Sequence, residues 1–167
     1  KAEDPAVVAV AEDGGAVIPV LGGHHGANDL ARRVAGILGI APAITTASDL
    51  RFGVALDDPP TGWHLANIEA YKGFMARLLA QPAVWVEGEI PWLEDTSLPI
   101  DENAALTIRA SVTAADPGQN TLLYHPETLA LGVGCERDVA PEELIALARK
   151  TLAEADLAPE SVAAVVS

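Results

Sequence analysis

The chain alternates short apolar runs with glycine-rich turns and stretches of helical periodicity. Residues 6–10 and 16–21 are apolar and enclose an Asp-Gly turn at 12–15, which predicts a β-hairpin. Apolar residues then recur at helical spacing within residues 30–38, and a further apolar stretch occupies residues 43–46. This segment therefore predicts a β-turn-α-β unit with parallel strands.

Residues 58–128 combine one amphipathic helix with several short strands. Apolar side chains at helical spacing in residues 68–79 predict a core helix, and residues 84–86 predict a strand. The alternation in residues 106–112 predicts a half-exposed strand, and residues 121–124 predict its hairpin partner beyond a polar turn. The pattern is typical of a small α+β domain.

The last part repeats the order of strand, turn and helix seen in the first. Residues 129–135 predict a strand that enters a second glycine-rich turn, Pro141 suits the first position of a helix, and residues 162–166 predict another buried strand. The chain is therefore expected to be an α/β protein. Its β-turn-α-β segments with parallel strands stand at both ends, and a small α+β middle domain separates them. The expected divisions are residues 1–57, 58–128 and 129–167.

Composition narrows the possible functions. Half of the 167 residues are hydrophobic, which is enough to build a core. The net charge of −14 argues against nucleic acid and anionic membrane surfaces as partners, and no apolar run approaches the roughly 18 residues of a membrane span. Cys135 is the only cysteine, so no internal disulfide can form, which fits a reducing cytoplasm. Cys135 itself is expected to be a small buried hydrophobic residue.

The turn between the second strand and the first helix has the composition of a binding site. Three glycines there allow positive φ angles and the close approach of a ligand: Gly22, Gly23 and Gly26. The unpaired amides at the start of the helix, with the imidazoles of His24 and His25, suit an anionic substrate and proton transfer. Asn28 or Asp29 is expected to cap the helix. A tight βα turn with two surface histidines explains the same residues, and both alternatives stay open.

Other candidates lie near predicted strand ends and on the first helix. Thr45 and Thr46 stand at the carboxyl end of a predicted strand, where open α/β sheets bind ligands. Arg32 and Arg33 either reach a carboxylate or are solvated. His125 precedes a proline and is held in an extended conformation, which favours a plain strand end over a site residue.

Two motifs make the sequence recognisable. Gly-Gly-His-His-Gly-Ala-Asn-Asp-Leu-Ala-Arg-Arg at residues 22–33 and Pro-Ala-Ile-Thr-Thr-Ala-Ser-Asp at residues 42–49 resemble the cobalamin-biosynthesis protein G (CbiG) family of cobalt-precorrin-5A hydrolases. The commoner family form reads Ser-Gly-His-x-Gly-Gly-Ala-Asn, so this turn is one residue shorter and offers two candidates for the family's histidine. The resemblance continues at residues 121–126 and 132–137, and it is closest to the variant fused to a precorrin-3B C17-methyltransferase. Against this family both ends of the chain are expected to be cut.

The resemblance implies a role in cytoplasmic cobalamin biosynthesis. The implied reaction is hydrolysis of the ring-A δ-lactone of cobalt-precorrin-5A or a related precorrin, with release of acetaldehyde. The motif aligns His24 with the family's histidine, which implies that His24 is catalytic. The residues expected to bind the polycarboxylate tetrapyrrole are Gly22, Gly23, His25, Gly26, Asn28, Thr45, Thr46, Gly134 and Arg137. Cobalt would arrive in the substrate, so neither a cofactor nor a protein metal site is expected. The alternative is a non-catalytic tetrapyrrole-binding module that serves a fused or partner precorrin methyltransferase.

Overall fold

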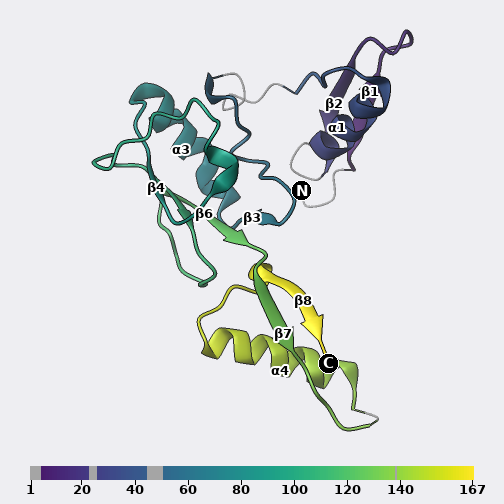
Figure 1. The fold of residues 1–167 in the computed structure, drawn as a ribbon, viewed down its shortest axis with the longest axis vertical. Helices are drawn as coiled ribbons and strands as arrows, with labels where there is room; N and C mark the ends of the chain where they lie inside the picture. Colours follow the sequence, from purple (N-terminus) through teal and green to yellow (C-terminus); the bar gives the residue numbers. More distant parts are fainter. Residues whose placement is uncertain (1–4, 23–25, 45–50, 138) are drawn as a thin grey trace. The chain divides into compact units, whose positions relative to one another are not determined.

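The computed structural model describes residues 5–22, 26–44, 51–137 and 139–167 and has the expected mixed α/β fold (Figure 1). The chain divides into two compact units, Lys1–Asp58 and Pro59–Ser167. The helices and strands, with η for a 3-10 helix, are β1 (Val7–Val10), β2 (Val17–Leu21), α1 (Ala27–Leu38), β3 (Trp63–Leu65), α3 (Ile68–Ala80), β4 (Trp85–Glu87), η2 (Pro91–Leu93), β5 (Thr107–Ala110), β6 (Thr121–Pro126), β7 (Leu129–Gly132), α4 (Pro141–Glu154), η3 (Pro159–Ser161) and β8 (Val162–Val166).

The first unit begins with the predicted hairpin. β1 and β2 pair antiparallel, and the amide of Ala11 donates to the carbonyl of Ala16 at 2.9 Å. Within the turn, the carboxylate of Asp13 accepts a hydrogen bond from the amide of Gly15 at 2.9 Å, a local contact that is typical of aspartate in turns. The hairpin predicted around residues 12–15 is therefore confirmed.

Small side chains attach α1 to this hairpin. The buried cluster consists of Val17, Ala31 and Ala35, with Val8, Val34 and Ile40 packed around it. The larger residues whose spacing indicated the helix lie mostly outside the cluster: Leu30, Ile37 and Leu38 are exposed, and Ile37 keeps 85% of its surface. The helical period was thus sufficient to find α1, but the face that packs is the alanine face, because alanine allows a helix to approach a sheet closely.

The strand predicted at residues 43–46 is described only in part. The amide of Ala43 donates to the carbonyl of Val17, the first residue of β2, at 2.8 Å. The chain therefore returns to β2 after α1, in the order that the β-turn-α-β prediction requires. The rest of the predicted strand lies outside the described residues.

Four strands form the central sheet of the second unit, in the order β3-β6-β5-β4. β3 is antiparallel to β6, whereas β6, β5 and β4 run parallel. Because Thr107 of β5 lies beside Thr121 of β6 in a parallel register, the predicted hairpin between these strands is wrong. The connection through residues 111–120 carries the chain back to the starting end of β5. β6 has neighbours on both sides and is buried from Thr121 to His125, as expected for a central strand.

The side chain of Asn67 joins the start of α3 to this central strand. Its amide nitrogen donates to the carbonyl of Thr121 at 2.8 Å, and its amide oxygen accepts from the backbone amide of Leu123 at 3.1 Å. Both contacts are buried. The helix that follows is the predicted core helix, and its buried side chains are Phe74, Met75 and Leu78.

The chain ends in a second β-α-β segment. β7 and β8 pair parallel, as predicted, and α4 connects them (Figure 1). The more buried side chains of α4 recur every four residues, at Leu144, Ala148 and Leu152. Ile145, which directly follows Leu144, is 52% exposed.

Candidate functional site

The central glycine-rich turn joins β2 to α1, as the sequence predicted. α1 begins at Ala27, next to the expected start at Asn28. The amide of Ala27 donates to the carbonyl of Gly22 at 3.0 Å, and the amide of Leu30 donates to the carbonyl of Gly26 at 2.9 Å. The turn therefore closes on itself and passes directly into the helix.

The structure places half of the predicted site residues. Those outside the described residues are Gly23, His24, His25, Thr45 and Thr46. Those that are described are Gly22, Gly26 and Asn28 in the first unit and Gly134 and Arg137 in the second. The roles of all ten stay predictions.

Two glycines of the central turn are required by its backbone. Gly22 and Gly26 hold φ angles of +73° and +92°, which other residues rarely adopt. A Cβ atom on Gly22 would also lie 2.8 Å from the carbonyl oxygen of Pro5, closer than side chains pack. Gly26 is the N-cap of α1 and offers no side chain for capping. The prediction that Asn28 or Asp29 caps the helix is therefore wrong, because both residues lie inside its first turn.

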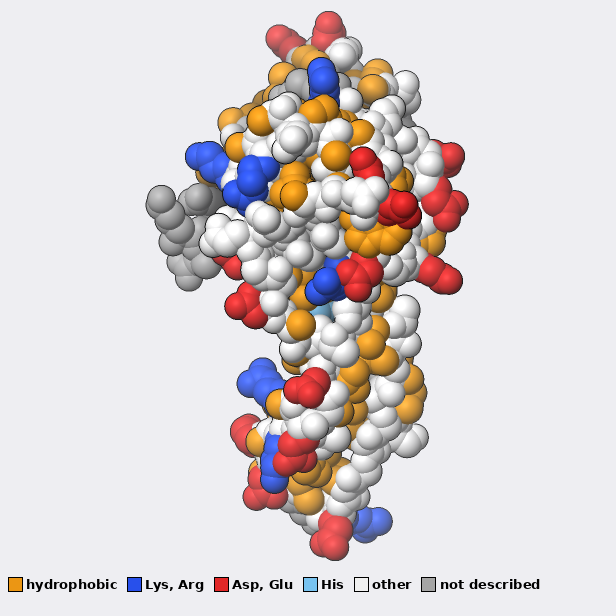
Figure 2. Space-filling model, turned by 90° about the vertical axis from the view of Figure 1, so that its left-hand side faces the viewer, with side chains coloured by type: hydrophobic (Ala, Val, Ile, Leu, Met, Phe, Trp, Pro, Cys, Tyr) orange, Lys and Arg blue, Asp and Glu red, His pale blue; other side chains and the backbone are white. Residues whose placement is uncertain are grey.

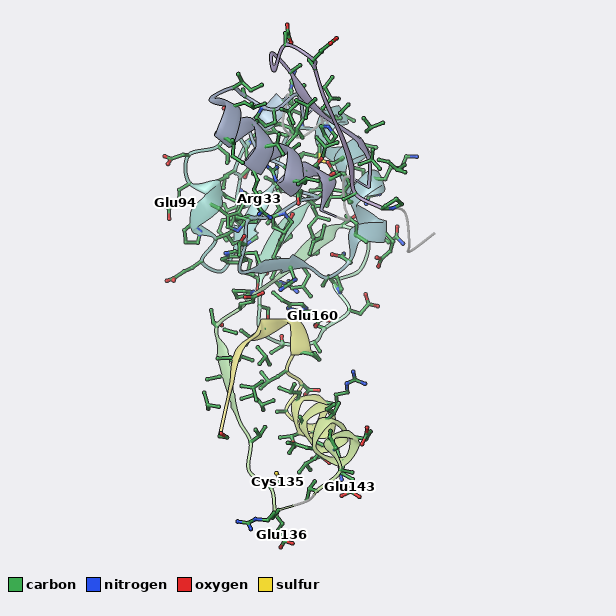
Figure 3. The ribbon with its side chains drawn as sticks, turned by 90° about the vertical axis from the view of Figure 1, so that its right-hand side faces the viewer. Arg33, Glu94, Cys135, Glu136, Glu143 and Glu160 are labelled. Atoms are coloured by element: carbon green, nitrogen blue, oxygen red, sulfur yellow. The ribbon has the colours of Figure 1, made fainter. Side chains whose placement is uncertain are left out.

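The start of α1 is suited to an anionic group. The first amides of a helix have no partner within the helix, and its dipole favours negative charge there. Asn28 lies in this first turn and is only 4% exposed. Further along α1, Arg32 and Arg33 (Figure 3) are both exposed, and Arg32 pairs with Asp58 at 2.7 Å.

The second glycine-rich turn follows β7 and is open to solvent. Gly134 and Arg137 are both exposed. Cys135 is exposed as well, so its predicted burial is wrong, because β7 ends before it and the residue lies on the loop. Figure 3 shows Cys135 and Glu136 on this loop, near Glu143 at the start of α4. Since carboxylates stand beside this turn, anion binding there would depend on the guanidinium of Arg137.

Acidic side chains dominate the surface. Figure 2 shows Asp and Glu scattered over the visible face, with Lys and Arg only in small groups, in keeping with the net charge of −14. In the second unit, Glu87 pairs with Arg109 and Glu127 pairs with His64, both at 2.7 Å. An anionic ligand must therefore be held by local donors against an unfavourable overall field.

The sequence favoured His125 as a plain strand end, but its surroundings are those of a positioned group. It lies near the carboxyl end of β6, is 4% exposed, and its Nδ1 lies 2.6 Å from the carbonyl oxygen of Ser111. A carbonyl oxygen can only accept, so Nδ1 carries a proton and donates it, and in the neutral form of the ring Nε2 is then an acceptor. Ser111 directly follows β5. The contact therefore joins the carboxyl ends of two parallel strands, where α/β sheets commonly bind ligands.

His125 also lines a cavity of about 320 Å³. Its other walls are Leu65, Ala66, Ala114, Ala115, Ala158 and Glu160. The cavity is thus small and presents polar and apolar surface in similar amounts, including one imidazole and one carboxylate. These residues come from distant parts of the chain, so no local sequence pattern predicts that they meet. The only local signal at His125 was the proline that follows it.

Metal-ligating side chains are dispersed in the part of the chain that the structure describes. No three of its His, Cys, Asp or Glu residues are grouped so as to hold an ion. None of its helices combines the length and the apolar composition that crossing a bilayer requires. The expected absence of a cofactor stays a prediction.

Comparison with known proteins places these features in context. Residues 1–49 match the family described as Cobalamin synthesis G N-terminal. Over 98% of its length the chain is 32% identical to the cobalt-precorrin-5A hydrolase of Priestia megaterium, and it covers 50% of that protein. Over 34% of its length it is 53% identical to the cobalt-precorrin-5A hydrolase of Salmonella typhimurium, of which it covers 16%.

A solved structure gives a related match. The crystal structure of a cobalamin biosynthesis protein G homologue from Sulfolobus solfataricus is 26% identical in sequence, with a TM-score of 0.36. That match covers 98% of this chain and 50% of the other. The chain thus spans at most half the length of the relatives that it matches. The family match includes the whole central turn.

Proposed function

We propose that the chain acts in cobalamin biosynthesis by hydrolysing the ring-A δ-lactone of cobalt-precorrin-5A, or of a related precorrin, with release of acetaldehyde. The observation that carries this proposal is the 32% identity with the cobalt-precorrin-5A hydrolase of Priestia megaterium over 98% of the chain. The family match over residues 1–49 adds to it, because that range contains the glycine-rich turn with its two histidines.

In this proposal the central turn supplies the proton transfer. Opening a lactone requires a water molecule that loses a proton to a base while its oxygen bonds to the carbonyl carbon. His24 is the proposed base, and in this proposal His25 would be on the outer side of the turn. Backbone amides of the turn would stabilise the oxyanion that forms. The ring C–O bond then breaks, and the proton passes from His24 to the leaving oxygen. For acetaldehyde to leave, the hydroxyl so formed loses its proton as the C–C bond between the two-carbon fragment and the macrocycle breaks, and the electron pair of that bond stays on the macrocycle, which takes up a proton.

The described part of the turn supports such a role. Gly22 and Gly26 give the turn its positive φ angles, and neither carries a side chain that would keep a ligand from the backbone. The amides of the first turn of α1 add donors at the same place. Asn28 is buried in that turn, where its side-chain amide is a further candidate for contact with substrate.

The remaining proposed contacts would hold the carboxylates of the tetrapyrrole. They are Gly23, Thr45 and Thr46 in the first unit and Gly134 and Arg137 in the second. Among them the guanidinium of Arg137 can make charge-assisted hydrogen bonds, which are stronger than those between neutral groups. Cobalt belongs to the substrate in this proposal, and no resident cofactor or protein metal site takes part.

The setting of the reaction is also part of the proposal. The resemblance to the fused variant suggests action beside a precorrin C17-methyltransferase, either on the same chain or as a partner. The reaction would take place in the cytoplasm, without nucleic acid or membrane partners. The three-part division at residues 1–57, 58–128 and 129–167 is retained as the proposed domain organisation.

The test is turnover by this chain with cobalt-precorrin-5A, followed by assay of acetaldehyde and by measurement of substrate binding. Acetaldehyde release that matches substrate consumption supports the hydrolase. Tight binding without release would instead support the alternative, a tetrapyrrole-binding module that serves a methyltransferase. The absence of both binding and release would contradict both functions.

A further inference from the structure

The cavity at His125 has no role in the proposed hydrolysis of the lactone. It lies where the parallel strands β5 and β6 end, and its walls come from β3, β6 and the segments around residues 114 and 158. We propose that this cavity is a second ligand site, which binds a small aliphatic amine in its ammonium form.

The imidazole of His125 has a fixed orientation in the cavity. Nδ1 of His125 is engaged with the carbonyl oxygen of Ser111 at 2.6 Å, and the ring lines the cavity. The polar atom left to face the cavity is therefore Nε2. In the neutral form of the ring with the proton on Nδ1, Nε2 presents a lone pair and takes a ligand that donates an N–H or O–H.

The neighbouring histidine, His64, is engaged with another group. His64 stands directly opposite His125 in the pairing of β3 with β6. Its Nε2 lies 2.7 Å from a carboxylate oxygen of Glu127, at an exposed position. His64 and Glu127 thus satisfy each other, and the cavity keeps one imidazole, from His125, and one carboxylate, from Glu160.

The groups that line the cavity favour one kind of ligand. An acceptor nitrogen and a carboxylate both favour a cationic N–H donor, and both disfavour an anion. The alanine and leucine walls favour a short hydrocarbon chain, and a volume of about 320 Å³ is at the lower end for ligand pockets. The net charge of −14 adds a field that attracts cations. An aliphatic ammonium of a few carbon atoms meets all of these conditions.

The walls of the cavity are held in place without a ligand. The amide of Ala114 donates to the carbonyl of Asp156, and the amide of Ala158 donates to the carbonyl of Val112, both at 2.8 Å. Thr113 and Leu157 form a further β-bridge between the same two segments. A ligand therefore has little chain to order when it binds, which favours affinity.

The experiment uses three probes with three carbon atoms each on the whole chain: n-propylammonium, 1-propanol and propionate. Binding is followed through the ring ¹H and ¹⁵N resonances of His125. We expect a saturable change with n-propylammonium, a weaker one with 1-propanol and none with propionate. Binding of propionate as tight as that of n-propylammonium, or no saturable change with any probe, would overturn the proposal.

Two substitutions test the named groups. His125→Asn keeps an N–H donor near the Nδ1 position but removes Nε2, and the affinity for n-propylammonium should fall about ten- to a hundredfold. His64→Asn, its neighbour across the strands, is the matched control and should leave the affinity unchanged. An affinity of His125→Asn equal to that of the native chain would reduce His125 to a structural role and contradict the site.

Glu160→Gln provides a test that does not depend on a buried residue, because Glu160 is exposed. The affinity for n-propylammonium should fall about two- to fivefold, as expected for one exposed ion pair, whereas Glu143→Gln on α4 should have no effect. If His125→Asn does not fold, this pair decides the proposal, and equal affinities for the two variants would refute it. None of these measurements uses a precorrin, so the outcome is independent of the proposed hydrolysis.

Discussion

The turns that lead into α1 and α4 are alike in sequence and different in backbone. Both follow a strand and both carry glycines. Gly22 has a φ of +73° and leaves no room for a Cβ atom, whereas Gly134 has no such φ and no described atom within 4 Å of a Cβ position. Glycine is therefore a requirement of the first turn, while the backbone of the second turn gives no steric reason for it.

The starts of the two helices also differ in backbone conformation. α1 begins behind Gly26 in the left-handed region, while α4 begins behind Ala140 in an extended conformation with a proline at its first turn. Glu142 and Glu143 also occupy the first turn of α4, where they compensate the helix dipole. The comparison shows that glycine spacing alone does not identify an anion site. Both helix starts carry acidic residues, because Asp29 lies in the first turn of α1, so the described difference between them is the conformation of the backbone at the N-cap.

The largest expected difference between the two turns is in their contribution to the rate of the reaction. If the first turn is catalytic, His24→Ala should lower the rate of acetaldehyde release by about 10²–10⁴-fold, because a positioned base contributes on that scale. Substrate binding should be nearly unchanged. Single-turnover rates with cobalt-precorrin-5A provide the measurement.

His25→Ala is the matched control for this prediction, since neighbouring residues in a turn direct their side chains apart. It should cost little. A loss carried by His25→Ala would show that the alignment of this shortened turn is off by one residue. If neither variant is slower, the turn is a binding element, and the module function is favoured over the hydrolase.

The backbone difference should appear in stability. Gly22→Ala places a Cβ atom 2.8 Å from the Pro5 carbonyl oxygen at a φ of +73°, and we expect it to lower the free energy of unfolding by roughly 2–4 kcal/mol. Gly134→Ala should change it by less than about 0.5 kcal/mol. Urea unfolding followed by circular dichroism gives both values. Similar losses for the two variants would remove the contrast between the turns.

The second turn can still contribute through its cation. Arg137→Ala should weaken the binding of a polycarboxylate tetrapyrrole by roughly 1–3 kcal/mol if the guanidinium makes a charge-assisted contact. Titration calorimetry measures this change, and Arg149→Ala on α4 controls for the loss of one positive charge. An affinity equal to that of the native chain would show that Arg137 is a solvated surface residue that does not contact the tetrapyrrole.

The smallest expected effect concerns the carboxylates at the start of α4. Replacing Glu142 and Glu143 together by glutamine should lower the free energy of unfolding by about 0.3–1 kcal/mol at low ionic strength, because the helix dipole loses its compensation. The loss should shrink in high salt. Glu136→Gln, on the preceding loop, is the control. A double variant that is more stable than the native chain at low salt would contradict this reading of the helix start.

Local signals in the sequence were enough for the elements at both ends. The Asp-Gly pair found the first hairpin, the glycine turn located the start of α1, and Pro141 marked the start of α4. The exposed residues Leu30, Ile37 and Leu38 show a limit of this approach. Periodicity predicts a helix. Which of its residues pack against the neighbouring strands depends on how closely the helix approaches them.

Features that depend on distant partners were not predicted. The pairing of β5 with β6 follows from the path of residues 111–120, and the polar turn within that segment gave the false signal of a hairpin. The surroundings of His125 depend on Ser111 and Glu160, which come from other parts of the chain. Among the predicted site residues that the structure describes, only Gly22 and Gly26, which are fixed by local backbone geometry, have a structural reason for their identity.

The two hydrogen bonds of Asn67 have a consequence for aggregation. β3 has only three residues, so it covers only part of that edge of β6. Beyond it, the Asn67 side chain accepts from the amide of Leu123 and donates to the carbonyl of Thr121, as a neighbouring strand would. Uncovered groups of this kind attract strands from other chains. One side-chain amide therefore stands in for a missing strand and prevents the central β-strand from becoming a template for intermolecular pairing.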